Sequence, residues 1–263
     1  MTSIWGIVNA TPDSFSDGGR YADVDAAVAH GLRLRADGAA VLDIGGESTR
    51  PGAERVPVAE EQRRVLPVIE RLAAEGIPVS VDTLNAATAA AAVRAGARIV
   101  NDVSGGLADP EMLAAVAESG ADIALGHWRG PSADMYARAE YVRVGREVAG
   151  ELRERIAAAA AAGIAPARII VDPGIGFAKT AAQNWTLLHD LADIVSLGPR
   201  VLVGTSRKRF LADLLGPDAD ERRKDLVTAV TSALAARAGA WAVRVHDVAS
   251  TRDALAVLDA WDR

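Results

Sequence analysis

Several polar side chains that could bind a small molecule follow directly after short apolar runs of the sequence. The clearest run is 169–172, a β-branched segment that is typical of a buried strand and ends at the carboxylate of Asp172. Gly174 and Gly176 follow it, and small residues there allow a bound molecule close to the backbone. Similar runs end at Asn9, Asp43, Asp82, Asn101, His127, Ser206–Lys208 and Arg244–His246.

These side chains suit two kinds of ligand. The carboxylates and amide of Asp82, Asn101 and Asp172 suit the edge of a flat nitrogen heterocycle, which presents both donors and acceptors. The ammonium of Lys208 could donate to a carbonyl on that ring. Positive charge and donors for a phosphate-type anion are offered by Arg50, Arg207, Arg244 and His246. The residues therefore indicate an enzyme that joins a heteroaromatic ring to a phosphorylated group.

Each of these residues also has a purely structural explanation. A lone Asp at the end of a strand is commonly a helix N-cap or a turn former, and Asp43 and Asp102 fit that description. His127 fits a structural histidine as well as it fits a functional one.

The elements that position these residues alternate between strands and helices. Predicted strands cover 4–9, 40–44, 79–82, 99–102, 123–126, 169–172, 201–204 and 242–246. Gly residues mark four helix ends directly before a strand: Gly38, Gly96, Gly120 and Gly239. Eight such units predict an α/β fold, a (β/α)8 TIM barrel in one domain over 1–263. The alternative, an open doubly wound sheet, lacks its glycine-rich turn after the first strand.

In such a barrel the chemistry lies at the carboxyl ends of the strands. Residues two apart share a face, so Arg244 and His246 are expected to point into the mouth together, as are Ser80 and Asp82. The connections 11–21 and 48–57 exceed the usual length of about 2–6 residues, which predicts lids over the site.

Composition excludes several classes of protein. The 263 residues carry a net charge of −6, which argues against general nucleic-acid or acidic-membrane binding, and no run reaches the length of a membrane span. With no cysteine there is no disulfide, thiol nucleophile or thiolate metal site. The first residues lack the basic and apolar regions of a signal peptide, so a cytoplasmic location is the default expectation. No cluster has zinc spacing, so any metal is expected to be Mg²⁺ held partly by substrate phosphates. The segment 174–180 lacks the full spacing of a P-loop, which excludes an ATPase of that kind.

Seven motifs, in order, resemble those of the dihydropteroate synthase family and span nearly the whole chain. They lie at 9–19, 43–52, 80–83, 101–105, 172–177, 206–210 and 244–247. The resemblance implies condensation of 6-hydroxymethyl-7,8-dihydropterin pyrophosphate with para-aminobenzoate, the step of folate biosynthesis that is the target of sulfonamides. It also implies Mg²⁺ and a homodimer.

The resemblance assigns roles residue by residue. The pterin would be held by Asp82, Asn101, Asp172, Phe177 and Lys208. The pyrophosphate would meet Asn9, Thr49, Arg244 and His246, with Asn9 also at the metal. The para-aminobenzoate pocket would include Thr49, Pro51, Ser206 and Arg207, and loops carrying Phe15, Asp17 and Arg50 would close over the site. Catalysis would rest on Asp82, Lys208, Arg244 and His246.

Three positions depart from the family's pattern. Met is common where this chain has Trp5 and Gly126, and Ala178 replaces a glycine before Lys179. One hypothesis is that Trp5 fills the volume that Gly126 leaves empty.

Three rival functions remain at this stage. A pterin-barrel methyltransferase with a corrinoid partner would share the groups that bind the heterocycle but would not need the anion-binding pair. An aldolase-type barrel would use Lys208 as a Schiff-base nucleophile. A catalytically silent pterin-binding paralogue is the third.

Overall fold

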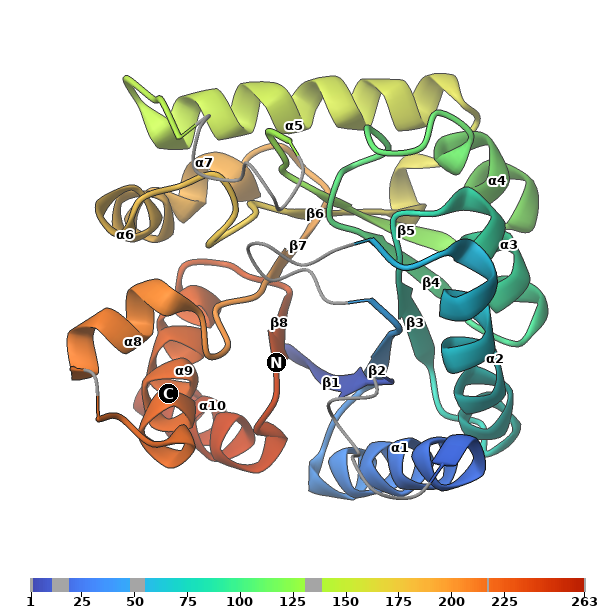
Figure 1. The fold of residues 1–263 in the computed structure, drawn as a ribbon. Helices are drawn as coiled ribbons and strands as arrows, with labels where there is room; N and C mark the ends of the chain where they lie inside the picture. The colour runs from blue at the N-terminus through green and yellow to red at the C-terminus, as the bar shows by residue number, and fades with distance from the viewer. Residues whose placement is uncertain (1, 11–18, 48–54, 131–138, 217, 263) are drawn as a thin grey trace.

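The computed structural model describes residues 2–10, 19–47, 55–130, 139–216 and 218–262. Within them, eight parallel strands close into a barrel in the order β1-β2-β3-β4-β5-β6-β7-β8, which confirms the predicted fold class. The strands are β1 (Ser3–Asn9), β2 (Val41–Gly45), β3 (Val79–Asp82), β4 (Ile99–Asp102), β5 (Asp122–Gly126), β6 (Ile169–Asp172), β7 (Arg200–Val203) and β8 (Ala242–Val245). Figure 1 shows the helices arranged around them.

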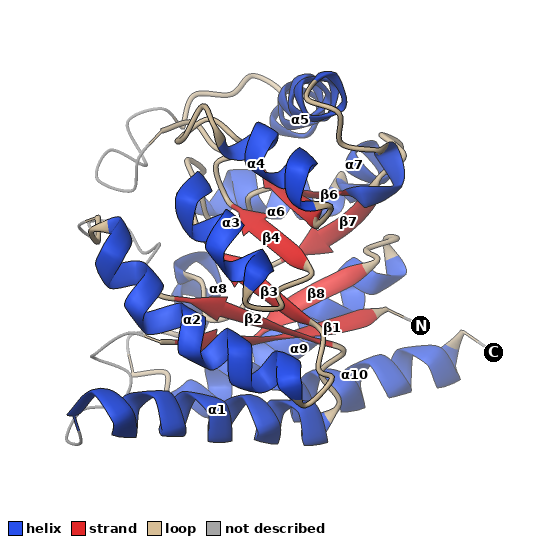
Figure 2. Cartoon of the chain, turned by 90° about the vertical axis from the view of Figure 1, so that its right-hand side faces the viewer, coloured by secondary structure: helices blue, strands red, loops and turns tan. Residues whose placement is uncertain are grey.

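Helices follow each strand and cover the outside of the barrel. They are α1 (Gly19–Asp37), α2 (Val58–Ala74), α3 (Ala86–Arg94), α4 (Met112–Ser119), α5 (Val144–Ala161), α6 (Ala181–His189), α7 (Leu191–Val195), α8 (Arg209–Leu215), α9 (Glu221–Arg237) and α10 (Val248–Trp261), with a 3-10 turn η3 (Pro166–Arg168) before β6. In Figure 2, α2 and α3 lie in front of the strands, α1 runs below them, and the two chain ends lie on one side. None of the described helices is both long and apolar enough to cross a membrane.

The predicted strands are each correct to within one residue at either end. Predictions for β3, β4 and β6 have the observed bounds, whereas β7 and β8 end one residue earlier than expected. Gly204 and His246 therefore lie just past their strands, in the loops of the barrel mouth. The four predicted helix-stop glycines all adopt positive φ, between 76° and 116°, a region in which a side chain is strained.

An apolar layer closes the inside of the barrel below the mouth. It consists of Trp5, Val41, Ile99, Ala124, Ile170, Leu202 and Ala242, one residue from each of seven strands. A second and larger apolar core lies between the strands and the helices. Because successive residues of a strand alternate faces, the polar residues two positions later are raised above this floor.

The space beside Gly126 is occupied by backbone. A Cβ atom added at Gly126 would lie 2.4 Å from the carbonyl oxygen of Val103 and 2.5 Å from its Cα. Trp5 lies in the floor layer with Ala124, two positions below Gly126. The structure thus gives this volume to the loop after β4, and the hypothesis that Trp5 fills it is wrong.

Replacing Gly126 by methionine is expected to destabilise the protein by about 1–3 kcal/mol, because the side chain would have to displace the backbone of Val103. Urea unfolding measures the change. Gly150→Met on α5 is the control, since nothing lies within 4 Å of a Cβ at Gly150. Equal unfolding midpoints for the two variants would contradict the explanation.

Candidate active site

Three charged side chains from different elements converge at the mouth of the barrel. A Cβ placed on Gly204 would lie 3.8 Å from Arg244 Cβ, 3.9 Å from Lys208 Nζ and 4.0 Å from Asp172 Oδ2. Asp172 ends β6, Lys208 lies between β7 and α8, and Arg244 is in β8. The predicted ring-binding and anion-binding groups therefore share one site.

Arg244 links two carboxylates across the barrel. Its Nε donates to Asp43 Oδ2 at 2.5 Å, and its Nη2 donates to Asp82 Oδ2 at 2.6 Å. Asn101 Nδ2 also donates to Asp43 Oδ2, at 3.1 Å. Both carboxylates and the amide are buried. This network connects the ends of β2, β3, β4 and β8.

The shared guanidinium sets the charge of this network. Burial by itself would lower the pKa of Arg244, but the ion pairs with Asp43 and Asp82 outweigh it and raise that pKa further above its ordinary value. Burial raises the pKa of Asp82, with Arg244 opposing the rise and Asp43 adding to it. The two buried acids, Asp43 and Asp82, thus share the single positive charge of Arg244. A second positive charge on a bound ligand would therefore also be stabilised here.

Asp172 and Lys208 form the second charged pair of the mouth. Asp172 Oδ1 accepts a hydrogen bond from the Gly174 amide at 2.7 Å; burial raises the pKa of Asp172, and Lys208 opposes this. Burial also lowers the pKa of Lys208 to about 8, against the attraction of Asp172. Lys208 Nζ donates to the Ile175 carbonyl and lies 4.7 Å from the centre of the Phe177 ring.

Gly176 is required for this approach. Its φ is +83°, and a Cβ there would lie 2.8 Å from Lys208 Cδ. The small-residue loop after β6 therefore wraps the lysine, and a side chain at position 176 would push it away.

Ser206 and His246 contact each other at the edge of the mouth. Ser206 Oγ lies 2.8 Å from His246 Nδ1 and accepts a hydrogen bond from the His246 amide at 3.1 Å. These two residues join the β7–α8 loop to the end of β8.

Arg207 is directed to α9 instead of to the charged cluster. Its Nε and Nη2 donate to the carboxylate of Asp225 at 2.7 and 2.8 Å, and its Nη1 pairs with Glu221 at 3.1 Å. The hydrogen bonds that Arg207 donates to Asp225 raise the pKa of Arg207. Its φ of +55° places it among the few strained non-glycine residues described.

Asn9 ends β1, half-buried, and pairs in register with Gly45 of β2. Five other predicted site residues lie outside the described residues: Phe15, Asp17, Thr49, Arg50 and Pro51. Their predicted roles stay predictions.

Comparison with known proteins gives the family. Residues 5–246 match the family described as Pterin binding enzyme. A dihydropteroate synthase from Mycobacterium leprae is 53% identical over 261 residues, which cover 97% of this chain and 92% of that protein. The chain belongs to the dihydropteroate synthase family.

Other relatives agree with this membership. A dihydropteroate synthase from Bacillus subtilis is 44% identical and aligns over 98% of this chain and 88% of its own. The Xanthomonas albilineans dihydropteroate synthase solved with 4-aminobenzoic acid has a TM-score of 0.92 and 49% identity, over 99% of this chain and 93% of that one. The same enzyme with 7,8-dihydropteroate has a TM-score of 0.89 and 46% identity, over 99% and 94%. The resemblance seen in the motifs is confirmed.

The sequence indicates no role in this dihydropteroate synthase family site for three of its buried residues: Asp43, Ser80 and Glu61. Asp43 fits a turn former in the sequence, but it pairs with Arg244; Ser80 is its neighbour in the β2–β3 register. Among the described atoms, Asp43 Oδ1 and Ser80 Oγ are buried without a partner. Strand parity predicts the position of Ser80, on the face of Asp82, and the same rule counted from Val41 of the floor layer places Asp43 in the mouth.

Glu61 on α2 gave no signal in the sequence. It is buried, and its oxygens accept hydrogen bonds from Thr83 Oγ1 at 2.7 Å, Asn85 Nδ2 at 2.7 Å and Thr88 Oγ1 at 2.6 Å. These donors belong to the turn that follows Asp82 and to the start of α3. Glu61 therefore fixes the backbone immediately after a central carboxylate of the site.

Two residues have the structural roles considered for them. Asp102 accepts hydrogen bonds from the amide and hydroxyl of Ser104 and the amide of Gly106, which makes it a turn former. His127 is buried between Glu151 and Lys179, as a structural histidine would be.

Glu61→Gln is expected to reduce the free energy of unfolding by about 1–3 kcal/mol. The glutamine NH2 group would replace an oxygen that accepts hydrogen bonds from Asn85 and Thr88, and these donors would lose their acceptor. Chemical denaturation measures this. Glu70→Gln is the matched control, since Glu70 lies on the same helix and is exposed. A Glu61→Gln variant as stable as the control would refute the anchoring role.

Proposed function

We propose that this chain condenses 6-hydroxymethyl-7,8-dihydropterin pyrophosphate with para-aminobenzoate to give 7,8-dihydropteroate and pyrophosphate. The observation that carries the proposal is the convergence of Asp172, Lys208 and Arg244 around Gly204, with Asp82 bound to Arg244. Groups suited to a heterocycle and groups suited to a polyanion are therefore within reach of one bound substrate. The family supports the choice of these two substrates, since a structure of a relative contains 4-aminobenzoic acid and another contains 7,8-dihydropteroate.

Protein groups complementary to the edge of a pterin lie at the ends of β3, β4 and β6. We propose that Asp82, Asn101 and Asp172 take the donors and acceptors of its edge, with Lys208 donating to its carbonyl. Phe177 packs beside that ammonium, and its ring can add apolar contact to the bound heterocycle.

The pyrophosphate is proposed to lie against the cations on the other side of the mouth. Arg244 stays charged throughout the working pH range and can neutralise negative charge as it develops, with donors from His246, Asn9 and Thr49. For para-aminobenzoate the proposed contacts are Ser206, Arg207, Thr49 and Pro51, with Phe15, Asp17 and Arg50 on the closing loops. Arg207 must share its guanidinium with Asp225 to contribute there.

The residues present suit Mg²⁺ only as a partly substrate-held ion. The carboxamide of Asn9 offers an oxygen of the kind that Mg²⁺ prefers, and no group of three or more His, Cys, Asp or Glu residues in the described parts of the chain could hold a metal. Asn9 would thus bind it together with pyrophosphate oxygens. When bound, the ion adds positive charge opposite the leaving group.

The proposed reaction is dissociative. The bond between the pterin methylene carbon and the pyrophosphate oxygen breaks, and its electron pair leaves with pyrophosphate. The methylene cation is stabilised by the buried carboxylate of Asp82, then attacked by the lone pair of the arylamine, whose nitrogen releases one proton to solvent. No strong base is needed, because an arylamine is neutral at pH 7.

Pyrophosphate release from the pterin substrate, with and without para-aminobenzoate, tests the function. Dihydropteroate formed only with the arylamine supports the synthase, and slow release without it supports the dissociative order. If borohydride trapped a Schiff base between Lys208 and a carbonyl substrate, the aldolase hypothesis would be favoured instead. Methyl transfer from a methylfolate would favour the methyltransferase, and no turnover with bound pterin would favour the silent paralogue.

Asp82→Asn is expected to keep the shape of the pterin contact but to lower kcat by about 100-fold or more. The reason is that a neutral amide does not stabilise the positive charge that develops on the pterin methylene. Steady-state kinetics with both substrates measures kcat and KM separately. An unchanged kcat would rule out the electrostatic role of Asp82.

Removal of divalent metal with EDTA is expected to slow pyrophosphate release, and added Mg²⁺ is expected to restore it. In the Asn9→Ala variant more Mg²⁺ is expected to be needed for half-maximal rate, since one oxygen ligand is lost. Equal Mg²⁺ requirements in the two proteins would remove Asn9 from the metal site.

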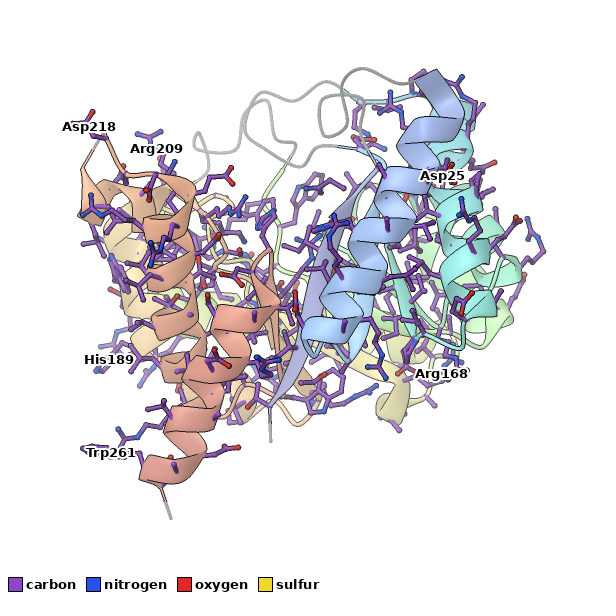
Figure 3. All side chains as sticks on the ribbon, turned by 90° about the horizontal axis from the view of Figure 1, so that it is seen from below. Asp25, Arg168, His189, Arg209, Asp218 and Trp261 are labelled. Carbon is purple, nitrogen blue, oxygen red and sulfur yellow. The ribbon has the colours of Figure 1, made fainter. Side chains whose placement is uncertain are left out.

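An exposed apolar face on α9 and α10 supports the expected homodimer. Leu226, Val230 and Leu234 recur every fourth residue of α9, and Val257 and Trp261 do so on α10, all exposed. The two helices pack against each other, and Figure 3 shows Trp261 projecting outward from α10. We propose that a second copy of the chain covers this face.

We also propose one domain over 1–263 and a cytoplasmic location.

Val230→Glu is expected to shift the protein from a dimer to a 27.3 kDa monomer, because the charge would be buried at the interface. Light scattering after gel filtration gives the mass. Leu107→Glu is the control, since Leu107 is an exposed apolar residue in the loop before α4. A dimer that survives Val230→Glu would place the interface elsewhere.

A further inference from the structure

Lys179 is a buried lysine that the proposed reaction does not use. It is 1% exposed, and its ammonium contacts three acceptors, each at 3.0 Å: the carbonyls of Gly174 and Phe177, and His127 Nδ1. A lysine ammonium has three hydrogens, so its donors and these acceptors match in number.

The acceptor role of His127 follows from its other neighbour. Burial works to raise the pKa of Glu151, but hydrogen bonds from His127 and Arg129 outweigh it and lower that pKa to about 2, so Glu151 is a carboxylate. His127 Nε2, 2.9 Å from Glu151 Oε2, must therefore donate to it. Burial, reinforced by Lys179, lowers the pKa of His127 to about 4, so the ring is neutral and its Nδ1 accepts.

The carbonyls that Lys179 binds belong to the loop that carries two proposed pterin contacts. The Gly174 amide donates to Asp172 Oδ1, so Gly174 is held through its amide by Asp172 and through its carbonyl by Lys179. The Phe177 carbonyl is bound by Lys179, while its ring lies beside Lys208.

The backbone of this loop is strained at Ala178 and needs stabilising contacts around it. Ala178, directly before Lys179, is buried and has φ +48°, a left-handed conformation that costs about 1–2 kcal/mol for a residue with a Cβ. Such a conformation persists only where the surroundings determine it. Lys179 follows Ala178 directly and its ammonium binds the carbonyl of Phe177, the residue before Ala178, so this hydrogen bond spans the strained residue.

The chain of contacts ends on a helix outside the barrel. Glu151 is part of α5, and Arg129 binds it at 3.1 and 3.2 Å while stacking 3.8 Å above the Tyr141 ring. Gln183 Nε2, in the first turn of α6, also donates to the Ala139 carbonyl, which joins the start of α6 to the β5–α5 loop.

We infer that Lys179 is a positioning residue that fixes the β6–α6 loop, and with it Asp172 and Phe177, to helix α5 through His127 and Glu151. The inference rests on the proposed function for its effect on pterin binding, but the ordering of the loop can be measured without activity.

The absence of cysteine allows a matched test. In Lys179→Cys the thiol introduced is unique, and alkylation in denaturant followed by refolding gives two side chains of lysine length. With 2-bromoethylamine the side chain ends in an ammonium, and with 1-bromopropane it ends in a methyl group. Wild-type protein taken through the same steps is the control, and assays at pH 6 favour the ammonium, because burial lowers the pKa of Lys179 to about 7.

In the propyl form the KM for the pterin substrate is expected to rise about 10-fold or more, with the KM for para-aminobenzoate nearly unchanged, and the aminoethyl form is expected to recover most of the loss. Amide hydrogen exchange over 173–180 is expected to be faster in the propyl form than in the aminoethyl form. Equal KM values and equal exchange in the two forms would overturn the inference, since a lysine that only fills volume would not distinguish them.

Two further outcomes keep the conclusions separate. Wild-type protein that releases no pyrophosphate would contradict the proposed function, while faster exchange in the propyl form would still support the loop anchor. If the alkylated forms do not refold, Lys179→Met made directly replaces them, with the half-buried Lys224→Met on α9 as its control. Unchanged exchange and KM in Lys179→Met would then refute the anchor.

Discussion

The site depends on one buried guanidinium held between two acids. Arg244 reaches from β8 to Asp43 on β2 and Asp82 on β3, so its charge is compensated by carboxylates of two neighbouring strands. A single buried ion pair is weak support for stability, because desolvation offsets most of the attraction. What this arrangement supplies is orientation: the guanidinium and the carboxylates hold fixed positions before any ligand arrives.

The barrel makes that arrangement possible by separating apolar from polar layers. A floor of side chains from Trp5 to Ala242 fills the interior. The polar mouth includes four residues that lie two positions further along their strands: Asp43, Asn101, Asp172 and Arg244. Among the described atoms, Asp43 Oδ1 and Ser80 Oγ stay buried without partners. Such groups reduce stability and are typical of a functional site, where local structure serves binding.

The backbone near the mouth is packed closely enough that glycine is needed at particular positions. Gly176 leaves room for Lys208, and Gly174 approaches the loop after β5 so closely that a Cβ there would lie 2.2 Å from the His127 carbonyl oxygen. The loops after β5 and β6 are thus fitted to each other, with Lys179 between them. Residues that never touch a substrate therefore set the positions of those that would.

The sequence by itself determined the eight strands, the barrel and the polar groups at its mouth. Each of these follows from local signals: β-branched runs, glycine stops, and the alternation that places Asp82 and Ser80 on one face. Only the tertiary structure decided which residues pair. It alone brings Asp43 to Arg244, 201 positions apart in the chain, turns Arg207 towards Asp225, and buries Glu61 under the turn after Asp82. Strand and turn signals act over a few residues, whereas a partner for a buried charge is chosen by barrel closure, which joins the first strand to the last.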